Sequence, residues 1–135
     1  MTVDGLIAIA SIDSYAATVE RLDVALSDHA IAPMLRWDHA AAAHEADLAL
    51  RPLLLVLFGD PRVGSALMQE QATTGIDLPL KLLIWKTASG QVMVGYNDPA
   101  WICRRHGLAD LPTSSQAMAA LLRDLAGTVA GQSGS

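Results

Sequence analysis

The chain has 135 residues, of which 52% are hydrophobic and 17% charged, and this composition excludes a globally disordered protein. A chain of this length is expected to form one domain, which we place over residues 1–130, followed by a flexible tail over residues 131–135. The formal net charge of −5 disfavours nucleic acid as a partner, because the phosphates would be repelled.

The sequence also lacks the signals of a membrane or secreted protein. No apolar run reaches the roughly 18 residues that a membrane span needs, and the N-terminus has no positively charged segment of a secretory signal. Cys103 is the only cysteine, so no internal disulfide is expected. These features predict a soluble protein of the reducing cytoplasm, with no membrane partner.

The first third of the chain reads as strand, helix, strand and short helix. Leu6–Ala10 is a short apolar run that predicts a buried strand, and Pro33–Trp37 is a second strand candidate with its proline at the start. Between them, apolar residues recur at helical spacing after Asp13 or Ser14, either of which can cap a helix. The alanine-rich segment after Asp38 predicts a short helix with that aspartate as its cap.

The most apolar run is Leu53–Phe58, six hydrophobic residues without alternation. This pattern is typical of a strand covered on both faces, or of a central strand that packs on the core with one face and on a dimer partner with the other. The run ends before Asp60 and Pro61, which suit the N-cap and the first position of a helix.

A hairpin and a second helix of the same design follow. Leu82–Thr87 and Val92–Tyr96 are predicted strands, and Gly90 supplies the positive φ that the short turn needs. Asp98, again followed by proline, caps the next helix, which is expected to end at Gly107.

The last predicted helix opens at Thr113–Gln116, which has the spacing of a capping box. An apolar stripe through Met118, Leu122 and Leu125 indicates that this helix docks on the sheet. The order of elements predicts an α+β fold, with a single mostly antiparallel or mixed sheet of about five strands and helices packed on it.

The segment Gly59–Ser65 has the glycine spacing of a phosphate-binding loop, but the lysine that should precede the serine is missing. Asp60 would repel a phosphate, so an aspartate-capped helix start is the better interpretation. Asp60 and Ser65 nevertheless lie where a strand ends, and both are candidate ligand-binding residues.

Histidine and carboxylate residues offer further candidates. His39 follows Asp38 at the end of a predicted strand, where binding sites often form. His39 and His44 are five residues apart and do not share a helical face, so no metal site is expected. Asp77 lies among apolar neighbours, and we interpret it first as a structural residue bonded to loop amides and alternatively as an active one.

Tyr96 and Asn97, at a strand end before a helix, offer a hydroxyl and an amide to a pocket, although Asn97 equally suits a turn.

Three classes of function remain open. We favour a domain that binds a small molecule in a pocket at the strand-end loops. One alternative is an enzyme that uses Asp77 or His39 as general acid or base. The other is a homodimeric interaction subunit without catalysis. The candidate ligand-binding residues are Asp38, His39, Asp60, Ser65, Asp77, Tyr96 and Asn97, and no catalytic residue or cofactor is identified.

Three stretches, FGDPRVGSALM, GIDLPLKLLIW and YNDPAWICRRHGL, together resemble the domain-of-unknown-function 302 family of small bacterial and archaeal proteins. The resemblance implies a compact α+β domain with a mostly antiparallel sheet, often a homodimer, and supplies no catalytic residues. This chain departs from the family at Asp60, where asparagine is usual, and at Gly64-Ser65-Ala66, where Gly-Thr-Pro is usual. The aspartate disfavours an anionic ligand at this loop.

Overall fold

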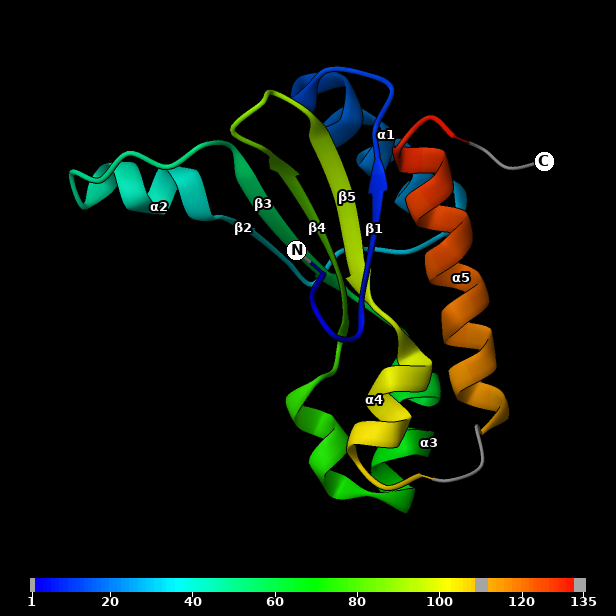
Figure 1. The fold of residues 1–135 in the computed structure, drawn as a ribbon. Coiled ribbons are helices and arrows are strands. Elements are labelled where there is room, and N and C mark those ends of the chain that lie inside the picture. Colours follow the sequence, from blue (N-terminus) through cyan, green and yellow to red (C-terminus); the bar gives the residue numbers. More distant parts are fainter. Residues whose placement is uncertain (1, 109–111, 133–135) are drawn as a thin grey trace.

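The computed structural model describes residues 2–108 and 112–132 of the chain. Within them, five strands form one sheet in the order β1-β5-β4-β3-β2, and every neighbouring pair is antiparallel (Figure 1). The predicted α+β fold with a single sheet is therefore confirmed. The strands are β1 (Leu6–Ala10), β2 (Leu35–Asp38), β3 (Leu53–Phe58), β4 (Leu80–Lys86) and β5 (Val92–Asn97).

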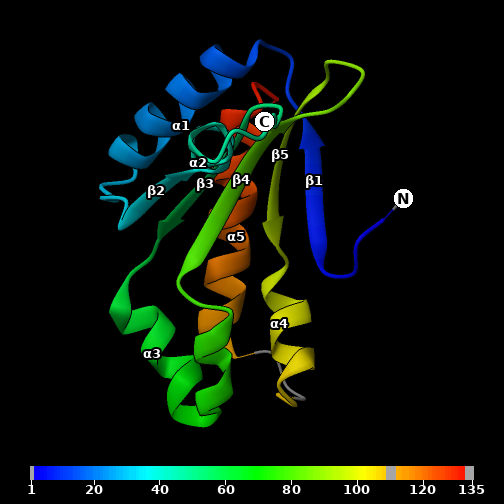
Figure 2. The same ribbon diagram turned by 90° about the vertical axis from the view of Figure 1, so that its left-hand side faces the viewer.

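The helices lie mostly on one side and at one end of the sheet. In Figure 2 the long helix α5 runs behind the strands, whereas α2 extends toward the viewer from the opposite face. Figure 1 shows α3 and α4 beyond the lower end of the sheet, where β3 and β5 end. The helices are α1 (Tyr15–Asp28), α2 (His39–Glu45), α3 (Pro61–Glu70), the 3₁₀-helix η1 (Ala72–Ile76), α4 (Pro99–Arg105) and α5 (Thr113–Val129).

The core lies between the sheet and the helical layer. Side chains alternate along β3, so that Leu54, Val56 and Phe58 are buried while their neighbours are only half-buried. The apolar stripe of α5 is buried against this face, as the sequence predicted. One face of each central strand thus supplies the core.

The other face of the sheet, here called the open face, is also largely apolar. The registers place Trp37 beside Leu55 and Leu55 beside Leu83 across three strands. Trp37 keeps 48% of its surface exposed. The unalternating run in β3 therefore reflects two apolar faces, and residues 2–108 and 112–132 cover only one of them with helices that supply the core. On β2, β3, β4 and β5 the large apolar side chains of the open face are Leu35, Trp37, Leu53, Leu55, Leu57, Leu83, Trp85 and Met93.

Four predicted helix caps are confirmed. Ser14, Asp38, Asp60 and Asp98 each accept a hydrogen bond from a backbone N–H in the first turn of the following helix. These short polar side chains replace the intrahelical partners that the first N–H groups lack.

The capping box predicted for the last helix is wrong. The helix α5 begins at Thr113, so this residue is already helical and Pro112 is the N-cap. The hydroxyl of Ser115 instead donates to the carbonyl of Pro112 at 2.7 Å. Because the helix starts one residue earlier than the spacing implied, no side chain is left in the N-cap position to accept from the first turn.

Other differences concern the ends of elements. The strand β4 starts at Leu80, two residues before the predicted start, and β2 starts at Leu35 rather than Pro33. The 3₁₀-helix η1 was not predicted. Of the expected tail, residues 133–135 lie outside the described ranges, whereas the side chain of Gln132 donates to the carbonyl of Ala10 at 2.7 Å.

Candidate functional site

A cavity of about 350 Å³ opens at the end of the sheet where β3 stops and β4 begins. Gly59 and Asp60 bring the chain from β3 into α3, and Leu78–Leu80 enters β4 beside them. The helix α5 closes the side nearest the core. The described lining residues are Met34, Gly59, Asp60, Pro61, Val63, Gly64, Ser65, Met68, Leu78, Pro79, Leu80, Ala117, Met118 and Leu121.

The interior of this cavity is apolar, and its polar groups lie at the mouth. Asp60 and Ser65 are the charged and hydroxyl-bearing side chains among the described lining residues, and both are exposed. Met34 and Met68 keep 54% and 36% of their surfaces exposed, and Met118 lies deeper at 3%. Methionine side chains are flexible and adapt to the shape of an apolar partner. The arrangement suits a small molecule with an apolar body.

Asp60 carries the negative charge at the mouth. Its Oδ1 accepts from the backbone N–H of Arg62 at 2.9 Å and from Nε of the same residue at 3.1 Å. Its Oδ2 accepts from Arg62 Nη2 at 2.8 Å. The hydrogen bonds from the Arg62 side chain, then the one from its backbone, hold the pKa of the Asp60 carboxyl below its ordinary value, so the group stays ionised near neutral pH.

Asp77 forms the centre of a second polar group beside the cavity. Both of its carboxylate oxygens accept from Arg105 Nη1 at 2.8 Å, and Oδ2 lies 2.6 Å from His106 Nε2. The side chains of Asp77 and His106 are only 11% and 7% exposed. The charged group among apolar neighbours is thus paired, as the sequence required. Its partners, however, are side chains of α4 and its C-cap rather than loop amides.

His106 extends this group to a hydroxyl. Its Nδ1 lies 2.8 Å from Thr73 Oγ1, which produces the order hydroxyl, imidazole, carboxylate known from nucleophilic catalysis. Here Arg105 shares the carboxylate, and neither Thr73 nor His106 is among the described residues of the cavity wall. We interpret Thr73, Asp77, Arg105 and His106, the Asp77 cluster, as the contact that fixes η1 against α4.

The segment after Asp77 connects this cluster to the cavity. Lys81 Nζ donates to the carbonyls of Asp77 at 3.0 Å and Pro79 at 2.9 Å. Burial lowers the pKa of Lys81, and the nearby Asp77 charge partly opposes that shift. Leu78 and Pro79, which lie between the bonded carbonyls, form part of the cavity wall. The cluster therefore positions one side of the cavity without lining it.

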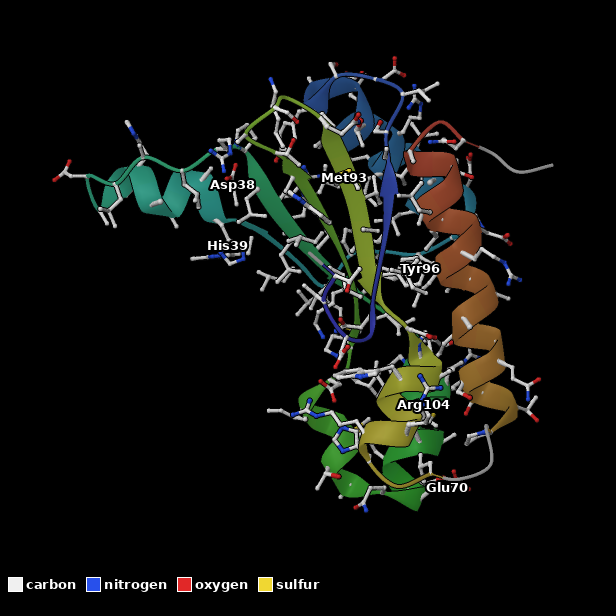
Figure 3. All side chains as sticks on the ribbon, viewed as in Figure 1. Asp38, His39, Glu70, Met93, Tyr96 and Arg104 are labelled. Atoms are coloured by element: carbon white, nitrogen blue, oxygen red, sulfur yellow. The ribbon has the colours of Figure 1, made fainter. Side chains whose placement is uncertain are left out.

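Asp38 and His39 lie away from the cavity. Asp38 caps α2 by accepting from the N–H of Ala41 at 2.9 Å, and His39 is the first residue of that helix. Figure 3 shows both at the base of the projecting α2. Asp77 is the C-cap of η1, which contacts α3, and Figures 1 and 2 show α3 at the other end of the molecule from α2. The structure therefore does not bring His39 and Asp77 together.

Tyr96 and Asn97 are not part of the described cavity wall either. Tyr96 is 6% exposed and points from β5 toward the helical layer (Figure 3). Burial, followed by the charge of Asp98, raises the pKa of its phenol. Asn97 pairs with Leu6 of β1 at the end of the sheet. Of the seven predicted site residues, Asp60 and Ser65 line the cavity.

Two further observations concern residues 2–108 and 112–132. In these ranges no group of three or more His, Cys, Asp or Glu side chains is placed to hold a metal ion. No helix in the same part of the chain is both long and apolar enough to cross a membrane.

Comparison with known proteins identifies relatives by sequence and, separately, by fold. The chain is 42% identical over 104 residues to a Brucella suis protein named fluoride-specific ion channel FluC 1, a match that covers 77% of this chain and 41% of that protein. A Brucella abortus protein of the same name matches with the same identity and is covered over 38% of its length. This chain thus spans about two-fifths of these relatives.

Among solved structures, an uncharacterised conserved DUF302 protein from Bacillus stearothermophilus has a TM-score of 0.81 at 16% identity. The alignment covers 94% of this chain and 99% of that one, and the likeness shows a common fold. A family model described as domain of unknown function DUF302 matches residues 7–128. Because this match covers most of the sequence, the chain belongs to the DUF302 family.

Proposed function

We propose that this domain binds a small, largely apolar molecule in the cavity between α3, α5 and the start of β4. The observation that carries the proposal is the cavity itself, about 350 Å³ in volume, with an apolar wall and its polar side chains at the mouth. Ligand sites in proteins generally combine an apolar lining with a few polar groups that orient the ligand. Among the seven candidate ligand-binding residues, Asp60 and Ser65 line this cavity, and we propose that these two contact the ligand.

Gly64 provides the test, because it lies on the cavity wall within α3. A Cβ at this position would meet Leu78 Cδ1 and Met68 Cε at 3.8 Å, an ordinary contact. We expect Gly64→Ala to keep binding and to stabilise the helix by about 1 kcal/mol. Gly64→Leu should fill part of the cavity and weaken binding of the apolar fluorophore N-phenyl-1-naphthylamine about tenfold. A loss of this size corresponds to the burial of about two fewer methylene-sized groups of the ligand.

The readout is a fluorescence titration of the two variants and the unmodified protein. Unfolding curves of the same samples show whether each variant is folded. Equal affinity of a folded Gly64→Leu variant and of the Gly64→Ala control would place the fluorophore elsewhere and remove the support for this cavity.

We also propose that the domain forms a homodimer in which a second copy covers the open face. Two sheets with apolar faces pack well on each other, and a face used by both copies suits a two-fold dimer. Trp37 and Leu35 are each 48% exposed on this face, and in Figure 2 α2 extends from the same side of the sheet. The oligomeric state of the protein in solution, measured by sedimentation, tests this second proposal.

The names of the Brucella relatives suggest a partner for this domain. The Brucella suis relative is named a fluoride-specific ion channel, and the match to this chain covers 41% of its length. We propose that this domain acts beside a channel of that kind. A tagged fragment of the Brucella protein outside the matched region should retain this chain on an affinity resin. Retention no greater than with an unrelated membrane protein would count against the association.

A further inference from the structure

The geometry points to a ligand with an aliphatic body and a head group that donates a hydrogen bond and carries no negative charge, such as an alcohol or an amine. This inference rests on the proposed function, since it concerns the same cavity, and it makes Asp60 the residue that selects the ligand. Three observations at the mouth support it: the N–H groups at the start of α3 are occupied, the described part of the wall contains no cationic side chain, and Asp60 can only accept hydrogen bonds.

The start of α3 is closed to an anion. A helix N-terminus attracts anions through its free N–H groups, but Pro61 has none. The N–H of Arg62 donates to Asp60 Oδ1, and those of Val63 and Gly64 donate to the Asp60 carbonyl at 2.9 and 3.1 Å. The first turn of α3 therefore has no N–H left for a carboxylate or phosphate, although the loop resembles a phosphate-binding one in glycine spacing.

The charge at the mouth also opposes an anion. Among the described residues of the wall there is no lysine, arginine or histidine. Arg62 pairs with Asp60, but its side chain is 91% exposed and it does not line the cavity. The Arg62 side chain is more exposed than that of Asp60, which is 40% exposed, so water screens the guanidinium more than the carboxylate, and an anionic head inside the cavity would meet net repulsion.

The Asp60 carboxylate favours a donor. An ionised carboxylate has only acceptor sites, about four in all. Arg62 occupies two sites on Oδ1 and one on Oδ2, which leaves a site on Oδ2. The hydroxyl of Ser65, on the same rim, can accept or donate. A hydroxyl or ammonium head can satisfy Asp60, whereas a carboxylate head cannot.

The test uses three ligands with the same ten-carbon chain, namely 1-decanol, decylamine and decanoate, at pH 8. Each competes with N-phenyl-1-naphthylamine for the full chain. We expect decanol and decylamine to displace the fluorophore and decanoate to bind at least about tenfold more weakly, which corresponds to about 1.4 kcal/mol.

The variant Asp60→Asn removes the charge and keeps the helix cap, because asparagine caps as well as aspartate. It should reduce the discrimination against decanoate to about threefold or less. Asp98→Asn is the matched control, since Asp98 caps α4 in the same way but does not line the cavity. This control should keep the discrimination of the unmodified protein.

The outcomes separate the two proposals. Failure of the fluorophore to bind the unmodified protein would overturn the proposed binding function and this inference with it. A fluorophore that binds but is displaced by neither decanol nor decylamine would overturn the inference alone. Displacement by decanoate as strong as by decanol would overturn the inference alone. Unchanged discrimination in a folded Asp60→Asn variant would likewise remove Asp60 as the selecting residue.

Discussion

At the scale of single residues, Asp77 connects parts of the chain that are far apart in sequence. Its carboxylate bonds to Arg105 and His106, and Arg105 also lies over the ring of Trp101, with Cζ 5.8 Å from the ring centroid. The ring in turn occupies the space beside Gly5, where a Cβ would lie 2.3 Å from Trp101 Cδ2. One buried carboxylate thus helps to fix η1, α4 and the turn before β1.

We expect Asp77→Ala to lower the free energy of unfolding by about 2 kcal/mol, because His106 and Arg105 lose a charged acceptor in a mostly buried position. The measurement is urea unfolding followed by circular dichroism. Asp23→Ala is the control, since Asp23 and Arg36 form a pair with side chains 53% and 40% exposed. Exposed pairs contribute at most about 1 kcal/mol. Equal losses in the two variants would show that the Asp77 cluster does not stabilise the fold.

At the scale of elements, α3 and α4 begin with the same Asp-Pro pair but serve different purposes. Both aspartates accept from the N–H two residues later, at 2.9 and 3.0 Å. The pair at Asp98 follows β5 and starts a helix whose Ile102 and Cys103 are buried. The pair at Asp60 follows β3, next to the point where Leu78 and Pro79 enter β4, and there it borders the cavity. Local sequence sets the cap, whereas the neighbouring segment decides whether the cap faces a site.

The C-terminal end of α4 likewise combines a feature that local sequence sets with a contact that depends on a distant segment. The N–H of Gly107 donates to the Arg104 carbonyl and that of Leu108 to the Cys103 carbonyl, a Schellman motif with Gly107 at φ +76°. The sequence predicted this end from glycine alone. Nothing in the local sequence indicated that the imidazole of His106 would bond to Asp77, 29 residues earlier.

At the scale of the whole molecule, the sheet has one covered and one open face. The indole of Trp85 lies across Gly95 of the neighbouring strand, where a Cβ would come within 2.8 Å of its ring. With Leu55 and Leu83 beside it, this forms a flat apolar surface of the kind that usually marks an interface. The dimer proposed above would cover it.

We expect the unmodified protein to sediment at about twice the chain mass of 14.2 kDa at micromolar concentration. Trp37→Glu, on the open face, should shift it to the monomer, because a charge buried without a partner is costly. Val24→Glu is the control: Val24 is 59% exposed on α1, away from the open face, and its substitution should leave the dimer intact. A protein that sediments only as a monomer before any substitution contradicts the proposal.

The sequence by itself determined the five strands, the five α-helices and the class of fold, although not the 3₁₀-helix η1. Apolar periodicity, the four caps, the hairpin turn at Gly90 and the helix end at Gly107 are local properties, and each depends on residues within a few positions of one another. The family resemblance carried by the stretches around Asp60, Asp77 and Asp98 was confirmed by the match over residues 7–128.

Only the tertiary structure decided what these elements build together. The strand order places β3 beside β4 and so brings Asp60 next to Leu78 and Pro79, and the packing of α5 against them completes the cavity. The same packing joins Asp77 to His106 and leaves His39 at the far end on α2. Such contacts link residues separated by about twenty or more positions. They arise from burying one face of the sheet, and no local pattern of residue types encodes them.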